Sequence, residues 1–225
     1  MEKTKKLLIV GIGETAILAH EYFMHDSEYE VVAFLADENF IKADLYRSLP
    51  LISINEAFAR YDAIEHYMFV AMGSGHLNRD RTNVYYRIKA IGYKFASYVS
   101  SYAFVWRNVE IGENCLILEN NTIQPFTKIG NNVVLWSGNH IGHRTEIKDH
   151  CFITSHVVIS GYCSIGEYSF IGVNAAIGDG VVIGKDNFIA MGAVISNSTE
   201  DNALYIGNPA VKKSIPAKRF CKVRE

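Results

Sequence analysis

Histidine is the side chain best suited to moving a proton near neutral pH. Four histidines fall in the second half of the chain, at His140, His143, His150 and His156. Each could serve as a general acid or base if its ring is exposed beside a bound substrate. His143 is the preferred candidate, because the repeat described below places it at a turn with its side chain pointing outward. The alternative is a surface or interface histidine with ordinary hydrogen bonds.

A second group of residues, near the N-terminus, has the spacing of a phosphate-binding turn. Gly11, Gly13 and Ala16 form a Gly-x-Gly-x-x-Ala pattern between an apolar segment and a helical one. Such glycines permit a tight turn, and the N-terminus of the following helix can hold a phosphate. Asp37 ends the next expected strand, where its carboxylate can accept a hydrogen bond from a ribose hydroxyl. The alternative is a plain strand-to-helix turn, since Gly-x-Gly alone is a weak signal.

The element that must position His143 is a six-residue repeat. An aliphatic residue recurs at every sixth position, which fits neither a helix nor a plain strand but fits a β-solenoid of short parallel strands. Three hexads make one triangular coil, so residues 18 apart stack about 4.8 Å from each other. The glycines that often follow the aliphatic residue suit corners with unusual backbone angles. The repeat runs through Ile111, Ile117, Ile123, Ile129, Leu135, Ile141, Ile147, Ile153, Ile159, Ile165, Ile171, Ile177, Ile183, Ile189 and Ile195.

A second inward column is expected four residues after each aliphatic position, where the residues are small or β-branched almost throughout. Cys115, Cys151 and Cys163 fall in this column. We therefore interpret these cysteines as small buried residues rather than as metal ligands or disulfide partners. Nothing indicates a role for Cys221.

The stacking also brings a glycine beside the candidate base. Gly161 lies 18 residues after His143 and so occupies the same column on the next coil. A glycine stacked next to an imidazole leaves room for a substrate group. This juxtaposition follows from the repeat alone.

The first hundred residues alternate between strand and helix patterns. Strands are expected over 5–10, 30–36, 66–72 and 93–99, with helices after Gly13 to about residue 25 and from 78 to about 91, the second capped by Asn78. Such alternation predicts a small parallel sheet with helices on its faces. The expected domains are a Rossmann-like domain (1–100), a left-handed parallel β-helix (101–200) and a C-terminal tail (201–225). One half of a dinucleotide fold favours a mononucleotide-linked ligand over a dehydrogenase cofactor.

Composition narrows the class of protein further. The chain has 225 residues, of which 49% are hydrophobic and 20% charged, and a net charge of −2. That balance does not favour a nucleic-acid partner. No apolar run reaches the ~18–20 residues of a membrane helix, and no signal peptide is recognisable, so membrane insertion is not expected and a cytoplasmic location is.

A Rossmann-like domain leading into an uninterrupted hexapeptide solenoid resembles the bacterial sugar O-/N-acyltransferase family. This family includes the sialic acid O-acetyltransferases and the N-acetyltransferases of nucleotide-linked 4-amino-4,6-dideoxy sugars. The likeness extends over nearly the whole chain. It includes Phe69–Gly73 followed by Asn78 and Arg79, the segment 165–169, and the closing 207–210. The resemblance implies a homotrimer that binds acetyl-CoA between adjacent solenoids, without metal, and holds the nucleotide of the acceptor in the N-terminal domain.

Residue roles follow from the same resemblance. His143 matches the catalytic base of the family, and Gly161 matches a glycine whose backbone N–H meets the acetyl carbonyl. Contacts to acetyl-CoA are implied for Phe152, Gly161, Val173, Met191, Lys212 and Lys213. Contacts to the nucleotide sugar are implied for Gly11, Gly13, Glu14, Thr15, Asp37, Gly73, Asn78 and Arg79.

The sequence departs from the family at two places. An acidic residue follows the base in well-known relatives, but here Arg144 does. Arginine cannot accept the imidazole N–H, so the orienting group is open between Asn139, Glu146 and a backbone carbonyl. Phe152 stands where a second family histidine lies near the donor.

Other interpretations remain open on the residues alone. The outward aromatic residues Trp136, Phe152 and Phe170 could contact another copy or simply cover the solenoid. O-acetylation of a sialic-acid-like acceptor competes with N-acetylation. A zinc lyase would use His140, His143 and His156, although the usual ligand spacing is missing. An inert sugar-nucleotide sensor would bind both ligands without turnover.

Overall fold

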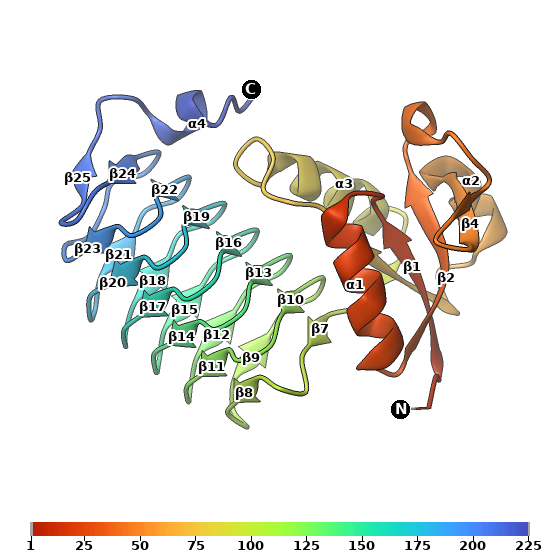
Figure 1. Ribbon diagram of the computed structural model, residues 1–225, viewed down its shortest axis with the longest axis horizontal. Helices are drawn as coiled ribbons and strands as arrows, with labels where there is room; N and C mark the ends of the chain where they lie inside the picture. Colours follow the sequence, from red (N-terminus) through yellow and green to blue (C-terminus); the bar gives the residue numbers. More distant parts are fainter. Residues whose placement is uncertain (1, 225) are drawn as a thin grey trace. The chain divides into compact units, whose positions relative to one another are not determined.

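The computed structural model describes residues 2–224, which form two compact units (Figure 1). The first unit ends at Gly73 and resumes over Asn83–Tyr98. The second comprises Ser74–Thr82 together with the chain from Val99 onward. Nine residues that follow a strand of the first unit thus belong, by their contacts, to the second. The domain limits at residues 100 and 200 stay a prediction.

The first unit is built on a six-stranded sheet of order β3-β4-β2-β1-β5-β6. The strands are parallel except for the β3–β4 hairpin. Its elements are β1 (Lys5–Val10), α1 (Glu14–His25), β2 (Tyr29–Ala36), the 3-10 helix η1 (Glu38–Phe40), β3 (Leu45–Tyr46), β4 (Leu49–Ser53), α2 (Ile54–Arg60), β5 (His66–Val70), α3 (Arg79–Lys89) and β6 (Lys94–Phe95).

The strands and helices expected at β1, α1, β2, β5 and α3 are confirmed. The single strand expected over 93–99 is wrong, because β6 pairs with β5 whereas β7 (Tyr98–Val99) is the first strand of a solenoid sheet. Gly11 at the end of β1 has a φ of +127°, and a Cβ there would lie 2.6 Å from the Ala71 carbonyl oxygen. Only glycine permits this close approach of the two chain segments.

The second unit winds short parallel strands into three stacked sheets. Residues 18 apart pair directly, as His140 does with Val158. The β16 sheet contains β7, β10 (Leu116–Ile117), β13 (Val134–Leu135), β16 (Phe152–Ile153), β19 (Phe170–Ile171), β22 (Phe188–Ile189), β24 (Leu204–Ile206) and β25 (Val211–Lys212). The β14 sheet contains β8 (Phe104–Val105), β11 (Thr122–Ile123), β14 (His140–Ile141), β17 (Val158–Ile159), β20 (Ala176–Ile177) and β23 (Val194–Ile195). The β15 sheet contains β9 (Glu110–Ile111), β12 (Lys128–Ile129), β15 (Glu146–Ile147), β18 (Ser164–Ile165) and β21 (Val182–Ile183).

Both inward columns of the solenoid are confirmed. From residue 117 on, the aliphatic positions are 0–3% exposed, and the small column from Cys115 to Ala193 is equally buried. A short helix, α4 (Ala217–Phe220), follows the last strands. Within residues 2–224, no helix has the length and apolarity needed to span a bilayer.

The buried cysteines should be inert to thiol reagents. Burial raises the pKa of Cys151 to about 12 and also raises the pKa of Cys163. Since the thiolate is the reactive form, we expect an aromatic disulfide reagent at pH 8 to label them at least ~10-fold more slowly in the native than in the unfolded protein. Equal rates in both states would contradict the burial of these two side chains.

The glycines after the aliphatic residues have a different role from the one expected. Gly142 and Gly166 do not have positive φ, but a Cβ on either would lie 2.4 Å from backbone atoms of the next coil. These glycines therefore permit close stacking of coils. The left-handed conformation falls two residues later in each hexad, where φ is positive at Asn114, Asn120, Phe126, Asn132, Gly138, Arg144, His150, His156, Tyr162, Tyr168, Asn174, Gly180, Asp186 and Gly192.

Candidate active site

His143 lies in the turn between β14 and β15, and its side chain is exposed. Its ring is fixed from two sides. The Tyr162 ring packs edge-on against it, with centroids 4.9 Å apart and an interplanar angle of 80°. The Gln124 Oε1 atom accepts a 2.9 Å hydrogen bond from the His143 backbone N–H and lies 3.4 Å from the ring Nδ1. An exposed imidazole with a supported ring is suited to proton transfer.

Gly161 lies directly against this ring. A Cβ at Gly161 would be 2.5 Å from His143 Cε1, so the stacking expected from the repeat is present. The Gly161 carbonyl accepts a hydrogen bond from the Gly180 N–H, whereas the Gly161 N–H donates to no acceptor among residues 2–224. The turn therefore pairs an exposed imidazole with a backbone donor that the fold does not use.

Gly161→Ala should displace the His143 ring because the added methyl group overlaps it. If His143 takes part in a reaction, we expect turnover to fall by about 10-fold or more, the scale of a displaced acid–base group. The matched control is Gly178→Ala, since a Cβ there has Ile195 O as its nearest atom at 3.5 Å. Steady-state kinetics of the two variants, with melting temperatures, separates the effects. Equal turnover in both variants would contradict the functional use of this stacking.

Gln124 is the side chain that contacts the base, and sequence reasoning did not identify it. Asn139 is buried, with its amide on Trp136 O and its Oδ1 accepting the Val157 N–H. Glu146 points outward from β15. Neither is among the partners of His143. Gln124 lies 19 residues before the histidine, which is one coil and one residue, so a search of the neighbouring column would have found it.

Arg144 turns away from the histidine. Its guanidinium carbon lies 4.5 Å from the centroid of the Phe126 ring, one coil earlier. The residue that replaces the acidic neighbour of the family is therefore held on an aromatic ring rather than on the imidazole.

The other solenoid histidines have different environments. His150 is 1% exposed and its Nδ1 lies 3.0 Å from the Asn132 amide nitrogen, so it has no access to a substrate. His140 is half-buried on β14. His156 is exposed in the turn after β16, where its ring lies over Gly138.

Val173 and Met191 stack on each other in the turns after β19 and β22, at another corner of the solenoid. Val173 is 38% exposed and Met191 is 77% exposed. The β14 sheet separates this corner from the one that carries His143. Within one chain, the residues implied for the donor and the base are thus at different corners.

Phe152 corrects two expectations. It is only 6% exposed, so it is not an open contact for a donor or for another copy. Its ring stacks on Phe170, which stacks on Phe188, with Phe220 packed against the end of this row. The Arg81 guanidinium lies 5.5 Å from the Phe152 centroid. Phe152 and Phe170 therefore pack within the chain, and Trp136 is likewise half-buried.

In the first unit, a pocket of about 290 Å³ opens beside the Gly-x-Gly turn. Gly11, Gly13, Thr15, Asp37 and Gly73 all line it, so five of the expected ligand residues come together. Glu14 is exposed in the first turn of α1 and is not part of the lining. The remaining lining residues are Val10, Ile12, Leu35, Ala36, Phe40, Ile54, Ala71, Met72 and Val84.

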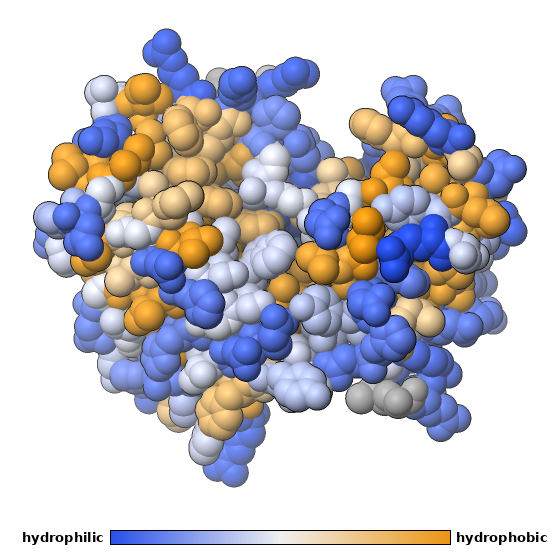
Figure 2. All heavy atoms as spheres, in the orientation of Figure 1, coloured by the Kyte–Doolittle hydropathy of each residue, from blue (hydrophilic) through white to orange (hydrophobic). Residues whose placement is uncertain are grey.

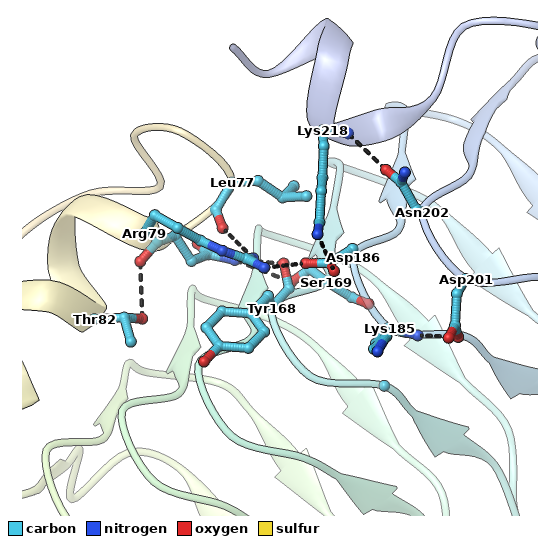
Figure 3. A network of polar contacts seen from close by, with 12 residues as sticks. Leu77, Arg79, Thr82, Tyr168, Ser169, Lys185, Asp186, Asp201, Asn202 and Lys218 are labelled. Carbon is cyan, nitrogen blue, oxygen red and sulfur yellow. Dashed lines mark hydrogen bonds and ion pairs between the residues drawn. The ribbon is translucent and has the colours of Figure 1, made fainter. Parts of the chain in front are cut away.

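Asn78 and Arg79 are a correction. Both belong to the second unit, where they hold residues 74–82 to the solenoid (Figure 3). Asn78 is fully buried and donates to Tyr168 O at 2.9 Å rather than capping α3. Arg79 pairs with Asp186 at 2.5 Å and lies over the Tyr168 ring. Side chains bound in this way are not open to a nucleotide.

Comparison with known proteins agrees with this architecture. Residues 126–161 and 162–197 match the family described as bacterial transferase hexapeptide (six repeats). The solenoid is a hexapeptide-repeat β-helix. Its class, a left-handed parallel β-helix after a Rossmann-like domain, is the one expected from the sequence. No curated protein sequence matches the chain significantly.

Solved structures share the whole fold. A mutant of perosamine N-acetyltransferase from Caulobacter crescentus, in complex with CoA and GDP-perosamine, superposes with a TM-score of 0.82 at 23% identity, covering 93% of this chain and 97% of that one. The acetyltransferase domain of PglB from Neisseria gonorrhoeae FA1090, in complex with acetyl coenzyme A, gives 0.84 at 23% identity, covering 93% and 100%. WeeI from Acinetobacter baumannii AYE gives 0.64 at 20% identity, covering 93% and 100%.

After the hexapeptide β-helix, the tail folds back on the last coils. Lys212 forms an ion pair with Glu200, and Lys213 is exposed without an ion-pair partner in the described chain. Lys218 lies 3.5 Å from Asp186, so Asp186 receives two cations (Figure 3). Of the two lysines implied for CoA, only Lys213 has its charge unopposed by a neighbouring carboxylate.

The histidines of the zinc alternative do not converge within the chain. Among residues 2–224, three or more potential ligand atoms come within 4.8 Å of one another only at Asp62, Glu65 and His66. Asp62 accepts two backbone N–H groups of its own turn, from Ile64 and Glu65. These contacts account for the acidic cluster as a local turn.

Proposed function

We propose that the protein is an acetyl-CoA-dependent N-acetyltransferase. Its acceptor would be the amino group of a nucleotide-linked 4-amino-4,6-dideoxy sugar used in bacterial surface polysaccharides. The observation that carries the proposal is the turn in which the exposed His143 ring covers Gly161, whose N–H has no partner in the described chain. The shared fold with sugar acetyltransferases that bind CoA, acetyl-CoA and GDP-perosamine supports it.

Each group at this turn has a step to perform. His143 takes a proton from the sugar ammonium or amine as nitrogen attacks the thioester carbonyl. The carbonyl oxygen becomes an anion that accepts a hydrogen bond from the Gly161 N–H. The C–S bond then breaks, and the imidazolium returns the proton to the departing CoA thiolate. No covalent acyl-enzyme is required. Gln124 and Tyr162 keep the ring in place throughout.

A homotrimer would complete the donor site. Val173 and Met191 lie at one corner of the hexapeptide β-helix and His143 at another, so a groove between two copies can unite them. The β14 sheet that joins these corners carries the exposed apolar side chains Phe104 and Val158. Figure 2 shows apolar residues among polar ones on the visible surface of the solenoid. Lys213 could meet a CoA phosphate beyond this groove.

The pocket of the first unit would hold the nucleotide of the acceptor. The α1 N-terminus, capped by Gly13 without a side-chain hydrogen bond, leaves backbone N–H groups for a phosphate. Phe40, which is 60% exposed and lines the pocket, offers a surface for a base. Asp37 would accept hydrogen bonds from the ribose.

The test is a transfer assay with purified protein and acetyl-CoA. The acceptors are dTDP-, UDP- and GDP-linked 4-amino-4,6-dideoxy sugars, with a sialic acid as the hydroxyl acceptor. Stoichiometric CoA release and an N-acetylated product with an amino sugar are expected. CoA release with the hydroxyl acceptor alone would instead favour the O-acetyltransferase, and binding of both ligands without turnover would favour a sensor.

A further inference from the structure

Asp37 is the only ionisable side chain among the residues that line the nucleotide pocket. Thr15 supplies the only side-chain hydroxyl there, and the rest of the lining is glycine or apolar. A bound molecule that carries hydroxyl groups therefore has few side-chain partners to choose from. Its recognition by polar side chains must depend largely on the Asp37 carboxylate.

The Asp37 carboxylate is not used by its own backbone. The residue caps the 3-10 helix η1, but without a side-chain hydrogen bond. Instead, Asp37 Oδ1 accepts a 2.7 Å hydrogen bond from Arg87 Nη2 on α3. Asp37 Oδ2 has no partner among the described residues. One carboxylate oxygen is thus held by an arginine, and the other is available.

The Arg87–Asp37 pair is poorly placed to stabilise the fold. The two side chains are 43% and 48% exposed, and exposed ion pairs contribute little to stability. The pair does restrict the carboxylate, however. A guanidinium on Oδ1 keeps the group ionised and limits its rotation, so that Oδ2 stays directed to other donors.

We infer that Arg87 is a positioning residue which orients Asp37 to recognise the 2′-hydroxyl of a ribonucleotide, so that the pocket selects ribonucleotides over their 2′-deoxy counterparts. The inference rests on the proposed function, since it assumes that the pocket holds a nucleotide. A ribose diol gives the carboxylate two donors, whereas deoxyribose gives one. A hydrogen bond to a charged group that is lost in this way lowers affinity by about 10-fold or more.

The experiment is a calorimetric titration with matched nucleotide pairs on the intact protein. The pairs are UDP with dUDP, GDP with dGDP, and 5-methyl-UDP with dTDP, so that members of a pair differ only at the 2′ position. The preferred base should show at least ~10-fold tighter binding of the ribo form. In Asp37→Asn this ratio should fall toward one. In Arg87→Gln it should fall at least ~3-fold while the melting temperature is unchanged.

Arg60→Gln is the matched control, because Arg60 is another exposed arginine of the first unit paired with a carboxylate, Glu56. It should keep the ribo-to-deoxy ratio of the wild type. Equal binding of both forms by the wild type, or an unchanged ratio in Arg87→Gln, would overturn the inference and leave the proposed function standing. If none of the nucleotides binds, the inference fails and the nucleotide role of the pocket fails with it.

Discussion

Replacing His143 by alanine is expected to lower turnover at least ~100-fold, with the affinity for acetyl-CoA little changed. The ring is the exposed imidazole stacked on Gly161, and in the proposed reaction it carries the proton from the attacking nitrogen to the departing thiolate. Proximity of the two substrates would remain and would give the residual rate. The measurement is a steady-state assay with saturating acceptor, combined with calorimetric titration of CoA.

His156→Ala is the matched control for this variant. His156 is also exposed, and its ring also lies over a glycine, Gly138, but it belongs to another corner of the solenoid. We expect His156→Ala to keep turnover within about threefold of the wild type, since an exposed side chain remote from the proton transfer contributes little. Near-normal turnover in His143→Ala would remove this residue as the base. A large loss in His156→Ala alone would transfer the role to that histidine.

The solenoid could be predicted from the sequence because its signal is strictly local. A repeat of six residues fixes which side chains face inward, and stacking at 18 residues then fixes which turns are neighbours. The contact of His143 with Gly161 follows from that arithmetic and is present in the structure. The same arithmetic misassigned the glycines after the aliphatic residues, because it gives position in the coil but not the backbone angle at each position.

The Gly-x-Gly turn and Asp37 were predictable for a related reason. The carboxyl ends of neighbouring parallel strands meet at one edge of a sheet, so Gly11, Asp37 and Gly73 come together at the pocket. Arg87 was not predictable. Its meeting with Asp37 joins α3 to the end of β2, 50 residues apart, and no local pattern marks it.

The segment 74–82 marks the limit of sequence reasoning in this chain. Asn78, Arg79 and Arg81 lie close together in the sequence, and a phosphate contact is a reasonable expectation for a polar cluster after a glycine-rich strand end. The structure instead places Asn78 and Arg81 in full burial against the solenoid. Burial of a charged residue depends on acceptors that come from distant coils, which here are the carbonyl groups around residues 132 and 150.

Arg81→Met is expected to give the largest loss of stability among single substitutions outside the aliphatic core. The Arg81 side chain is fully buried, and burial lowers its pKa to about 10, so the guanidinium remains charged at neutral pH. No carboxylate neutralises it in the printed contacts. Its donors reach Asn132 Oδ1 at 3.1 Å, Asn132 O at 3.2 Å and His150 O at 3.1 Å.

Asn132 extends the network that Arg81 supports. Its Oδ1 also accepts from the Asn114 amide at 2.8 Å, and its own amide nitrogen lies 3.0 Å from His150 Nδ1. Three successive coils are thus joined by one row of buried polar groups, with Arg81 at its side. Methionine has a similar length and fills similar space but donates nothing, so the carbonyl oxygens would stay buried and unsatisfied.

The expected cost of Arg81→Met is about 3 kcal/mol or more in the free energy of unfolding, because each unsatisfied buried acceptor costs about 1–3 kcal/mol. For a protein of this size, the melting temperature should fall by roughly 6–12 °C. Arg144→Met is the control, since that arginine is exposed over Phe126 and should change the unfolding free energy by less than about 1 kcal/mol. Urea unfolding followed by fluorescence measures both variants. An Arg81→Met protein as stable as the wild type would mean that packing around Leu77 and Phe152, rather than the guanidinium, holds residues 74–82 against the solenoid.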